Sequence, residues 1–361
     1  MAEKGITILG GGNTAFSVAA KLQLDGAAVT LCEIPSFAHM VEPILTTRQI
    51  QLDGVAGQDV ATLECVTTDF SVGLAHNELN LLIIPAYGHA AFAEACAPHL
   101  KSGQVVVLMP GTLGSLEFSR ILRQQGAAEG IALAETDTAP YVCRKMTPTS
   151  AHIWGVVAGL GLGVLPASQG PRVQQLVDRW FPGVQLYDDV AACGLAAMNP
   201  VVHPAGVLMN AGRIEKSDGD FYFYKEGITP GVCRLIYAVD RERLAIGQAL
   251  GFELSPVDTA FHQAGFGPAG DLETTISGSE MLTALKAPGV LNTRWLTEDV
   301  PYGLAAWAAL GEQLGVACPT MRSLVELIGT MLEIDFWDSA RTPEDLGIAG
   351  LGRDDLLAFL Q

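Results

Sequence analysis

The opening of the chain is the feature that most constrains its fold. Gly5–Leu9 (GITIL) is a short apolar run, and the glycine-rich turn GGGNTA follows it at once and opens an amphipathic helix that ends at Gly26. A second apolar run, Ala28–Cys32, is closed by Glu33. Strand, turn, helix and strand in this order predict a βαβ unit, the first building block of a doubly wound parallel sheet.

The residues of the turn also predict a dinucleotide cofactor. In the pattern GxGxxA, Gly10 permits the tight turn, Gly12 lets the backbone approach a pyrophosphate, and Ala15 lets helix and strand pack closely. Asn13 and Thr14 begin the helix, whose N-terminus offers oriented N–H groups and a partial positive charge to the phosphates. We therefore expect residues 10–15 to hold the pyrophosphate.

Glu33 stands about where a carboxylate binds the adenosine ribose hydroxyls in such folds. Its charge would repel the 2′-phosphate of NADP. No Arg or Lys lies between Glu33 and Thr47. The sequence therefore favours NAD as the cofactor, without excluding NADP.

Further apolar runs alternate with helical stretches as far as residue 186. They comprise residues 80–84, 104–109, 130–134, 151–156 and 184–186, and a hairpin at 46–53 and 60–65 is inserted among them. Ligands of a doubly wound sheet bind outside the carboxyl ends of its strands. The loops that follow the first two runs therefore predict cofactor contacts from Pro85, Ala86, His89 and Gly111. A purely structural role in its loop is the alternative for His89.

Beyond residue 186 the apolar spacing becomes helical. Helices are expected at residues 195–214, 230–250, 279–287, 302–314, 320–336 and 353–360. The sequence thus predicts two domains: a dinucleotide-binding domain over residues 1–186 with a Rossmann-type parallel sheet, and an all-α domain over residues 187–361 that binds substrate. A length of 361 residues is sufficient for two hydrophobic cores.

The chemistry is expected in the second domain. Asn199 and His203 are four residues apart in an apolar stretch, so on a helix they share one face. An imidazole among Val and Ala side chains suits a catalytic acid or base, although a hydrogen-bonded core histidine is the alternative. Farther on, Arg294 could hold a carboxylate and Asp299 could orient an imidazole. An ordinary helix cap is the alternative interpretation of that second stretch.

Composition excludes several other classes. A formal net charge of −18 provides no basic surface for nucleic acid or for an anionic membrane. The seven cysteines are scattered without a CxxC pair, which predicts reduced thiols in the cytoplasm and neither a disulfide framework nor a metal site. The N-terminus runs directly into a strand, so no secretion signal is expected. The apolar run at residues 153–165 is too short to span a bilayer and is interrupted by glycines, so no membrane segment is expected.

Several ordered stretches together resemble the opine dehydrogenase family of the octopine/nopaline type. They are GGGNTA with Glu33, IIPAYGH, LMPGTLG, ETDTAPYVCR, NPVVHPAGVLMNAGRIE, YKEGITP, LNTRWLTEDVPYGL and EIDFWDSARTPEDLGIAGL. The resemblance implies NAD(P)H-dependent condensation of an α-keto acid, by default pyruvate, with the amino group of an amino acid. It implies His203 as the catalytic acid/base, Asp299 as its partner, Arg294 as the ligand of the keto-acid carboxylate and Asn199 as a substrate contact. It also implies a homodimer.

Two other functions fit parts of the pattern. A β-hydroxyacid or ketopantoate-type reductase has a similar two-domain plan. Members of those families share a catalytic lysine at the position where this chain has His203, and the next lysine of this chain, Lys216, lies beyond the motif. A catalytically silent NADH-binding protein would not need His203, Arg294 and Asp299 together.

Overall fold

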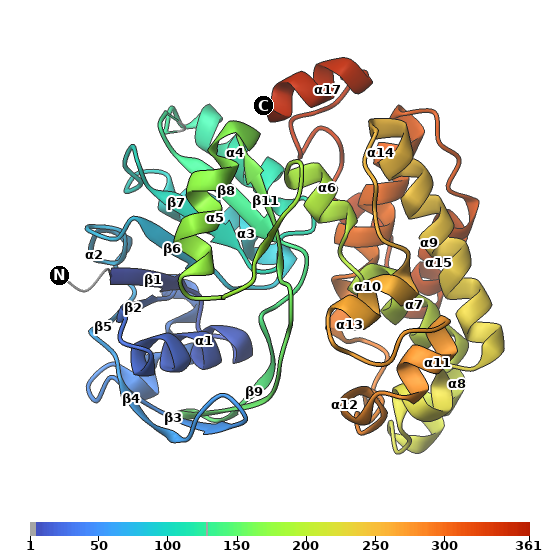
Figure 1. Cartoon of the computed structure of the whole chain (residues 1–361), viewed down its shortest axis with the longest axis horizontal. Coiled ribbons are helices and arrows are strands. Elements are labelled where there is room, and N and C mark those ends of the chain that lie inside the picture. Colours follow the sequence, from blue (N-terminus) through green and yellow to red (C-terminus); the bar gives the residue numbers. More distant parts are fainter. Residues whose placement is uncertain (1–4, 128) are drawn as a thin grey trace. The chain divides into compact units, whose positions relative to one another are not determined.

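The computed structural model describes residues 5–127 and 129–361, and its contacts divide the chain into two compact units (Figure 1). The first unit comprises Met1–Gly194 together with Gln361, and the second comprises Leu195–Leu360. Each unit has its own elements and core. They are described in turn.

An eight-stranded sheet forms the centre of the first unit, in the order β12-β11-β8-β7-β6-β1-β2-β5. Its strands are β1 (Gly5–Leu9), β2 (Ala28–Cys32), β5 (Cys65–Thr67), β6 (Leu79–Leu82), β7 (Val105–Leu108), β8 (Ala132–Thr136), β11 (Gly161–Leu165) and β12 (Gln185–Leu186). The six strands from β5 to β8 are parallel, whereas β11 runs antiparallel to β8. The predicted Rossmann-type α/β sheet is confirmed, with an antiparallel addition at one edge.

Helices connect these strands: α1 (Asn13–Leu24), α2 (Phe70–Gly73), α3 (His89–Cys96), α4 (Gly114–Gln124) and α5 (Gly170–Asp178). From β1 the chain goes first to β2 and β5 on one side, and then to β6, β7 and β8 on the other. The order therefore reverses between β1 and β6, which is where such sheets bind ligands. Strands β6 and β7 are buried at every residue, as expected for a sheet covered on both faces.

A second sheet of four strands belongs to the same unit, in the order β4-β3-β10-β9. Its strands are β3 (Gln49–Gly54), β4 (Asp59–Thr62), β9 (Tyr141–Thr147) and β10 (Ser150–Val156). The expected hairpin is present as β3 and β4. The prediction that residues 151–156 continue the main sheet is wrong, because β10 pairs with β9 across a tight turn and with β3. The apolar composition of β10 resembles that of a buried parallel strand, which explains the error. Strand β9 was not predicted from the sequence.

The second unit is helical, and its longest helix, α9 (Pro230–Leu250), begins and ends as expected. Thr229 caps it by accepting a hydrogen bond from the amide of Val232, and Gly251 in the left-handed region ends it. The other regular helices of this region are α6 (Val190–Leu195, at the unit boundary), α7 (Asn199–Met209), α8 (Ala211–Ser217), α10 (Val257–Gln263), α11 (Leu272–Ser277), α12 (Glu280–Thr283), α13 (Arg294–Thr297), α14 (Ala306–Gln313), α15 (Pro319–Leu332), α16 (Phe336–Ser339) and α17 (Arg353–Leu360).

Four of the expected helices are shorter or broken. Residues 195–214 do not form one helix, since non-helical residues precede Asn199 and a further break lies at Asn210. The helix expected over 302–314 starts as a π-helical turn, η6 (Val300–Ala305), and that over 279–287 is the single turn α12. The helix expected over 320–336 ends at Leu332, because Glu333 adopts a left-handed conformation.

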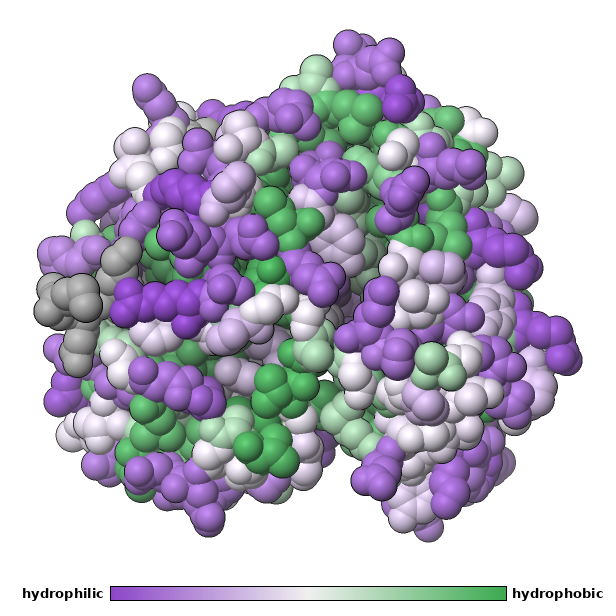
Figure 2. Space-filling model, in the orientation of Figure 1, coloured by the Kyte–Doolittle hydropathy of each residue, from purple (hydrophilic) through white to green (hydrophobic). Residues whose placement is uncertain are grey.

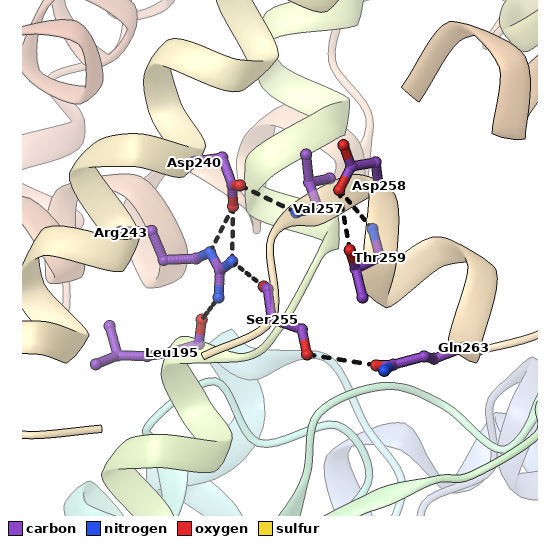
Figure 3. A network of polar contacts seen from close by, with 8 residues as sticks. All are labelled: Leu195, Asp240, Arg243, Ser255, Val257, Asp258, Thr259 and Gln263. Carbon is purple, nitrogen blue, oxygen red and sulfur yellow. Dashed lines mark hydrogen bonds and ion pairs between the residues drawn. The ribbon is translucent and has the colours of Figure 1, made fainter. Parts of the chain in front are cut away.

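A buried ion pair fixes α9 inside the second unit (Figure 3). The guanidinium of Arg243 donates to the carboxylate of Asp240 at 2.9 and 2.7 Å and to the carbonyl oxygens of Leu195 and Ser255. The second oxygen of Asp240 accepts from the amide of Val257. Both charged side chains are almost fully buried, so the charge of each is compensated by the other and not by water.

The face of the protein that Figure 2 shows carries mostly hydrophilic residues, with hydrophobic residues between them. Large hydrophobic side chains on or beside the second sheet are among those exposed: Val55, Val60, Met146, Trp154 and Val156. One run, Val190–Met209, is long and apolar enough to cross a membrane, but 89% of its apolar window is buried inside the protein. A helix in the core of a protein can be equally long and apolar, so this run is weak evidence of a membrane span.

Candidate active site and cofactor site

His203 lies at the centre of a hydrogen-bonded cluster in the second unit. Its Nδ1 is 2.8 Å from Oδ2 of Asp299, and its Nε2 is 3.2 Å from the hydroxyl oxygen of Tyr224. His203 lies on α7, Asp299 directly precedes η6, and Tyr224 lies on η5 (Phe223–Gly227), a second π-helical turn. The structure thus brings together the predicted pair, His203 and Asp299, and adds a tyrosine to it.

Two glycines allow the elements that carry this cluster to approach α7. A Cβ added to Gly303 of η6 would lie 2.4 Å from the ring of Pro200, and one added to Gly206 would lie 2.6 Å from Phe223. Real Cβ atoms do not tolerate such distances, so any side chain there would push η6 or η5 away from α7. Glycine at these positions therefore sets the distances from His203 to Asp299 and Tyr224.

An aromatic wall fixes the plane of the imidazole. The ring of Trp295 stacks on that of His203 with centroids 4.4 Å apart and an angle of 8° between planes. Phe223 meets the same indole edge to face at 4.8 Å. These rings leave the imidazole little rotational freedom and shield it from water on one face.

The partners of His203 define its neutral tautomer. An ionised carboxylate only accepts hydrogen bonds, so Nδ1 carries the proton and donates it to Asp299. Burial raises the pKa of the Tyr224 hydroxyl well above its usual value, and the negative charge of Asp299 raises it further. Tyr224 therefore stays protonated at neutral pH and donates to Nε2. Burial also raises the pKa of Asp299, while the hydrogen bond from His203 opposes that shift.

Arg294 is the first residue of the short helix α13, and Asp299 follows the end of that helix by two residues. The Nε of Arg294 donates to Oε2 of Glu298 at 2.5 Å, and its side chain is 56% exposed. Asp299 occupies the N-cap position of η6, as the cap interpretation expected, but its side chain makes no capping hydrogen bond and contacts His203. Asn199 is the first residue of α7, one turn before His203, and its side chain is exposed.

The glycine-rich turn of the first unit has the shape that a pyrophosphate requires. Gly10 has φ +118°, and a Cβ there would lie 2.6 Å from the carbonyl oxygen of Ile83. Gly12 has open space around its missing Cβ, and it precedes α1 without any side-chain cap. The first amides of α1, including those of Asn13 and Thr14, are therefore open to an anion. Ala15 is fully buried behind them, as close packing requires.

Another helix in this unit shows the contrast. The N-terminus of α4 is occupied by a buried carboxylate, because Glu135 accepts hydrogen bonds from the amides of Leu113 and Ser115 and from the Ser115 hydroxyl. That helix already has its anion. Of these two N-termini, the one at residues 12–15 is the one open to a phosphate.

Glu33 lies beside the glycine-rich turn. Its Oε1 accepts from the amide of Ile34 at 2.8 Å, and a Cβ added to Gly11 would lie 3.0 Å from its Oε2. Burial raises the pKa of this carboxyl, and backbone hydrogen bonds from Ile34 and Gly11 partly oppose the shift. Its placement after β2 fits the ribose position expected for it.

The other predicted cofactor contacts follow β6 and β7. Pro85 and Ala86 begin the turn η3 (Ala86–Gly88) after β6. His89 is fully buried, and a Cβ added to Gly114 would lie 2.2 Å from its Nδ1, so it packs against α4. Gly111 approaches Glu135 so closely that a Cβ would overlap that side chain. Cofactor contacts from these four residues remain predictions.

Three residues near these sites were missed by sequence reasoning: Tyr224, Glu298 and Lys145. Tyr224 lies in the YKEGITP stretch and Glu298 in LNTRWLTEDVPYGL, so both residues belong to motifs of the resemblance, but the sequence predicts no role for either of them. Nothing in the sequence places Lys145 near residues 10–15, because its position depends on the pairing of the second sheet. Among the described residues, no three His, Cys, Asp or Glu side chains gather as a metal site would require.

Comparison with known proteins reveals relatives over the whole chain. Residues 186–332 match the family model described as NAD/NADP octopine/nopaline dehydrogenase, alpha-helical domain. The chain is 31% identical to an opine dehydrogenase of Arthrobacter sp. (strain 1C), over 96% of both chains. Its fold is similar to octopine dehydrogenase solved with NADH and L-arginine (TM-score 0.77, 19% identity, 98% and 97% coverage). It is also similar to NADP+-bound yersinopine dehydrogenase (TM-score 0.75, 17% identity, 99% and 98% coverage).

Proposed function

The chain belongs to the opine dehydrogenase family, and from this membership we propose that it condenses an α-keto acid reductively with the amino group of an amino acid, using NAD(P)H. The observation that carries the proposal is the hydrogen-bonded group of Asp299, His203 and Tyr224. A bare dinucleotide-binding fold would not require an oriented, shielded imidazole.

His203 is the proposed acid/base. Condensation of an amine with a ketone forms a carbinolamine, and loss of its hydroxyl as water requires a proton, after which an imine remains. A protonated imidazole can supply that proton and recover one from the amine. Asp299 would hold the ring and stabilise its cation during this transfer, as a buried carboxylate does for a catalytic histidine elsewhere.

Arg294 is the proposed ligand of the keto-acid carboxylate. Its exposed guanidinium has the planar fork that a carboxylate binds in a bidentate manner. Glu298 binds Nε and thereby restrains the orientation of that fork. Asn199, one helical turn before His203, is proposed to donate or accept a hydrogen bond with substrate.

The first unit would hold the cofactor, whose nicotinamide, when bound, supplies the hydride that reduces the imine carbon. Open space at Gly12, the uncapped start of α1 and the strand-end carboxylate Glu33 fit a dinucleotide. We propose NADH as the preferred form, because the negative charge of Glu33 disfavours a 2′-phosphate. Pyruvate is the proposed keto acid, and a cytoplasmic homodimer is the proposed state of the enzyme.

The alternatives remain separable from this proposal. A simple keto-acid reductase would reduce pyruvate without an amine, and a silent binding protein would bind NADH without oxidising it. The relevant α7 position carries His203 and no lysine, which supports opine formation over reduction by a ketopantoate-type reductase.

The test is the loss of NADH absorbance with pyruvate, alone and with each member of an amino-acid panel. We expect oxidation only when both substrates are present, with a secondary amine as the product by mass spectrometry. Oxidation with pyruvate alone would identify a keto-acid reductase. Replacement of Arg294 by Met should raise the KM for pyruvate by on the order of 30-fold, while NADH binding stays unchanged.

A further inference from the structure

Lys145 comes from the second sheet, yet it lies beside the cofactor turn. Strand β9 packs on α1, and alternation along the strand directs Cys143 and Lys145 toward the helix and Arg144 away from it. The thiol of Cys143 is 3.7 Å from the hydroxyl of Thr14, and the amide of Lys145 donates to Oδ1 of Asn13 at 3.0 Å.

The ammonium group of Lys145 reaches the segment that follows Glu33. Its Nζ donates to the carbonyl oxygen of Met40 at 2.6 Å and lies 3.4 Å from the ring centroid of Phe16. A Cβ added to Gly11 would lie 2.9 Å from Cβ of Met40 and 3.0 Å from Oε2 of Glu33. The backbone at Gly11 therefore lies close to Glu33 and also to Met40, which is the residue that Lys145 contacts.

The two side chains also interact through their charges. Burial lowers the pKa of Lys145 to about 8, and the charge of Glu33 opposes that shift. The charge of Lys145 in turn opposes the effect of burial on the pKa of Glu33. Lys145 is still mostly protonated at pH 7 and is partly exposed, so its charge is available to a ligand.

We propose that Lys145 binds the adenosine 2′-phosphate of NADPH, so that two opposed charges, Glu33 and Lys145, set the balance between the two cofactors. The inference rests on the proposed dinucleotide-dependent function. In folds of this type the carboxylate after the second strand meets the ribose hydroxyls, and a cation nearby accommodates a 2′-phosphate. The absence of Lys and Arg from the stretch after Glu33 is thus compensated by a lysine from a different sheet.

The test measures binding, without turnover. NADH and NADPH are titrated separately into the wild-type chain and into Lys145→Met, Lys145→Arg and Arg144→Met, with nicotinamide fluorescence as the readout. We expect Lys145→Met to raise the Kd of NADPH about tenfold and to leave that of NADH nearly unchanged. Lys145→Arg should retain NADPH binding because it keeps the charge, and Arg144→Met, on the opposite face of β9, should affect neither. Glu33→Gln should tighten NADPH.

Other outcomes overturn the proposal. Equal weakening of NADH and NADPH in Lys145→Met would indicate a contact with the shared pyrophosphate or a structural role for β9. Unchanged Kd values would mean that Lys145 only anchors the second sheet to α1. A wild-type chain that binds NADH alone would refute Lys145 as a phosphate ligand, while one that binds neither dinucleotide would refute the proposed function itself.

Discussion

Replacement of Asp299 by Asn is the most direct test of the proposed mechanism. The side chains of Asp299 and His203 are 13% and 11% exposed, and their closest atoms are 2.8 Å apart. Asparagine has nearly the same volume, so packing is preserved while the charge is lost. An attraction between unit charges about 4 Å apart amounts to about 4 kcal/mol at an effective dielectric constant of about 20.

If that attraction is present chiefly when the imidazole is protonated in the transition state, its loss slows turnover about a thousandfold. The amide can also donate to Nδ1 and so favour the wrong tautomer, which acts in the same direction. The assay is kcat for NADH oxidation with saturating keto acid and amine. NADH binding, measured by fluorescence, should be unchanged because the glycine-rich turn is untouched.

A matched control is Asp271→Asn, since Asp271 caps α11 in the same unit and Asn is an equally good N-cap. This variant should keep wild-type kcat. A decrease of less than about tenfold for Asp299→Asn, in a folded protein, would refute the view that its charge stabilises the protonated imidazole.

Three further predictions concern other buried groups. Tyr224→Phe removes the partner of the His203 Nε2 and should lower kcat about tenfold with the pyruvate KM unchanged; wild-type kcat would contradict this. Arg243→Met leaves the buried carboxylate of Asp240 without its ion-pair partner and should lower the free energy of unfolding, measured with urea, by about 3–5 kcal/mol. A loss below about 1 kcal/mol would show that the pair is solvated. Burial raises the pKa of Asp137 to about 6. The folded state thus binds its proton more tightly than the unfolded state, and stability is lost as the pH rises from about 4 to about 6. Asp137→Asn should therefore gain up to about 3 kcal/mol relative to wild type over that window, and a pH-independent difference would refute the assignment.

The sequence alone determined the features that depend on neighbouring residues. The turn at Gly10 and Gly12 follows directly from strand and helix signals, because a βαβ unit is built from consecutive elements. The extent of α9 was equally readable, since Pro230 and Gly251 mark its ends. Spacing by four likewise placed Asn199 and His203 one turn apart on α7.

Only the tertiary structure decided which distant residues meet. The pairing of His203 with Asp299 was suggested by resemblance, but the contact depends on η6 packing against Pro200 at Gly303. The hydroxyl of Tyr224 reaches the same ring because Gly206 admits η5. Strand β10 was assigned to the wrong sheet because a short apolar run does not specify its neighbours. The position of Lys145 depends on that same pairing, since strand register and sheet membership arise from long-range contacts that no local pattern encodes.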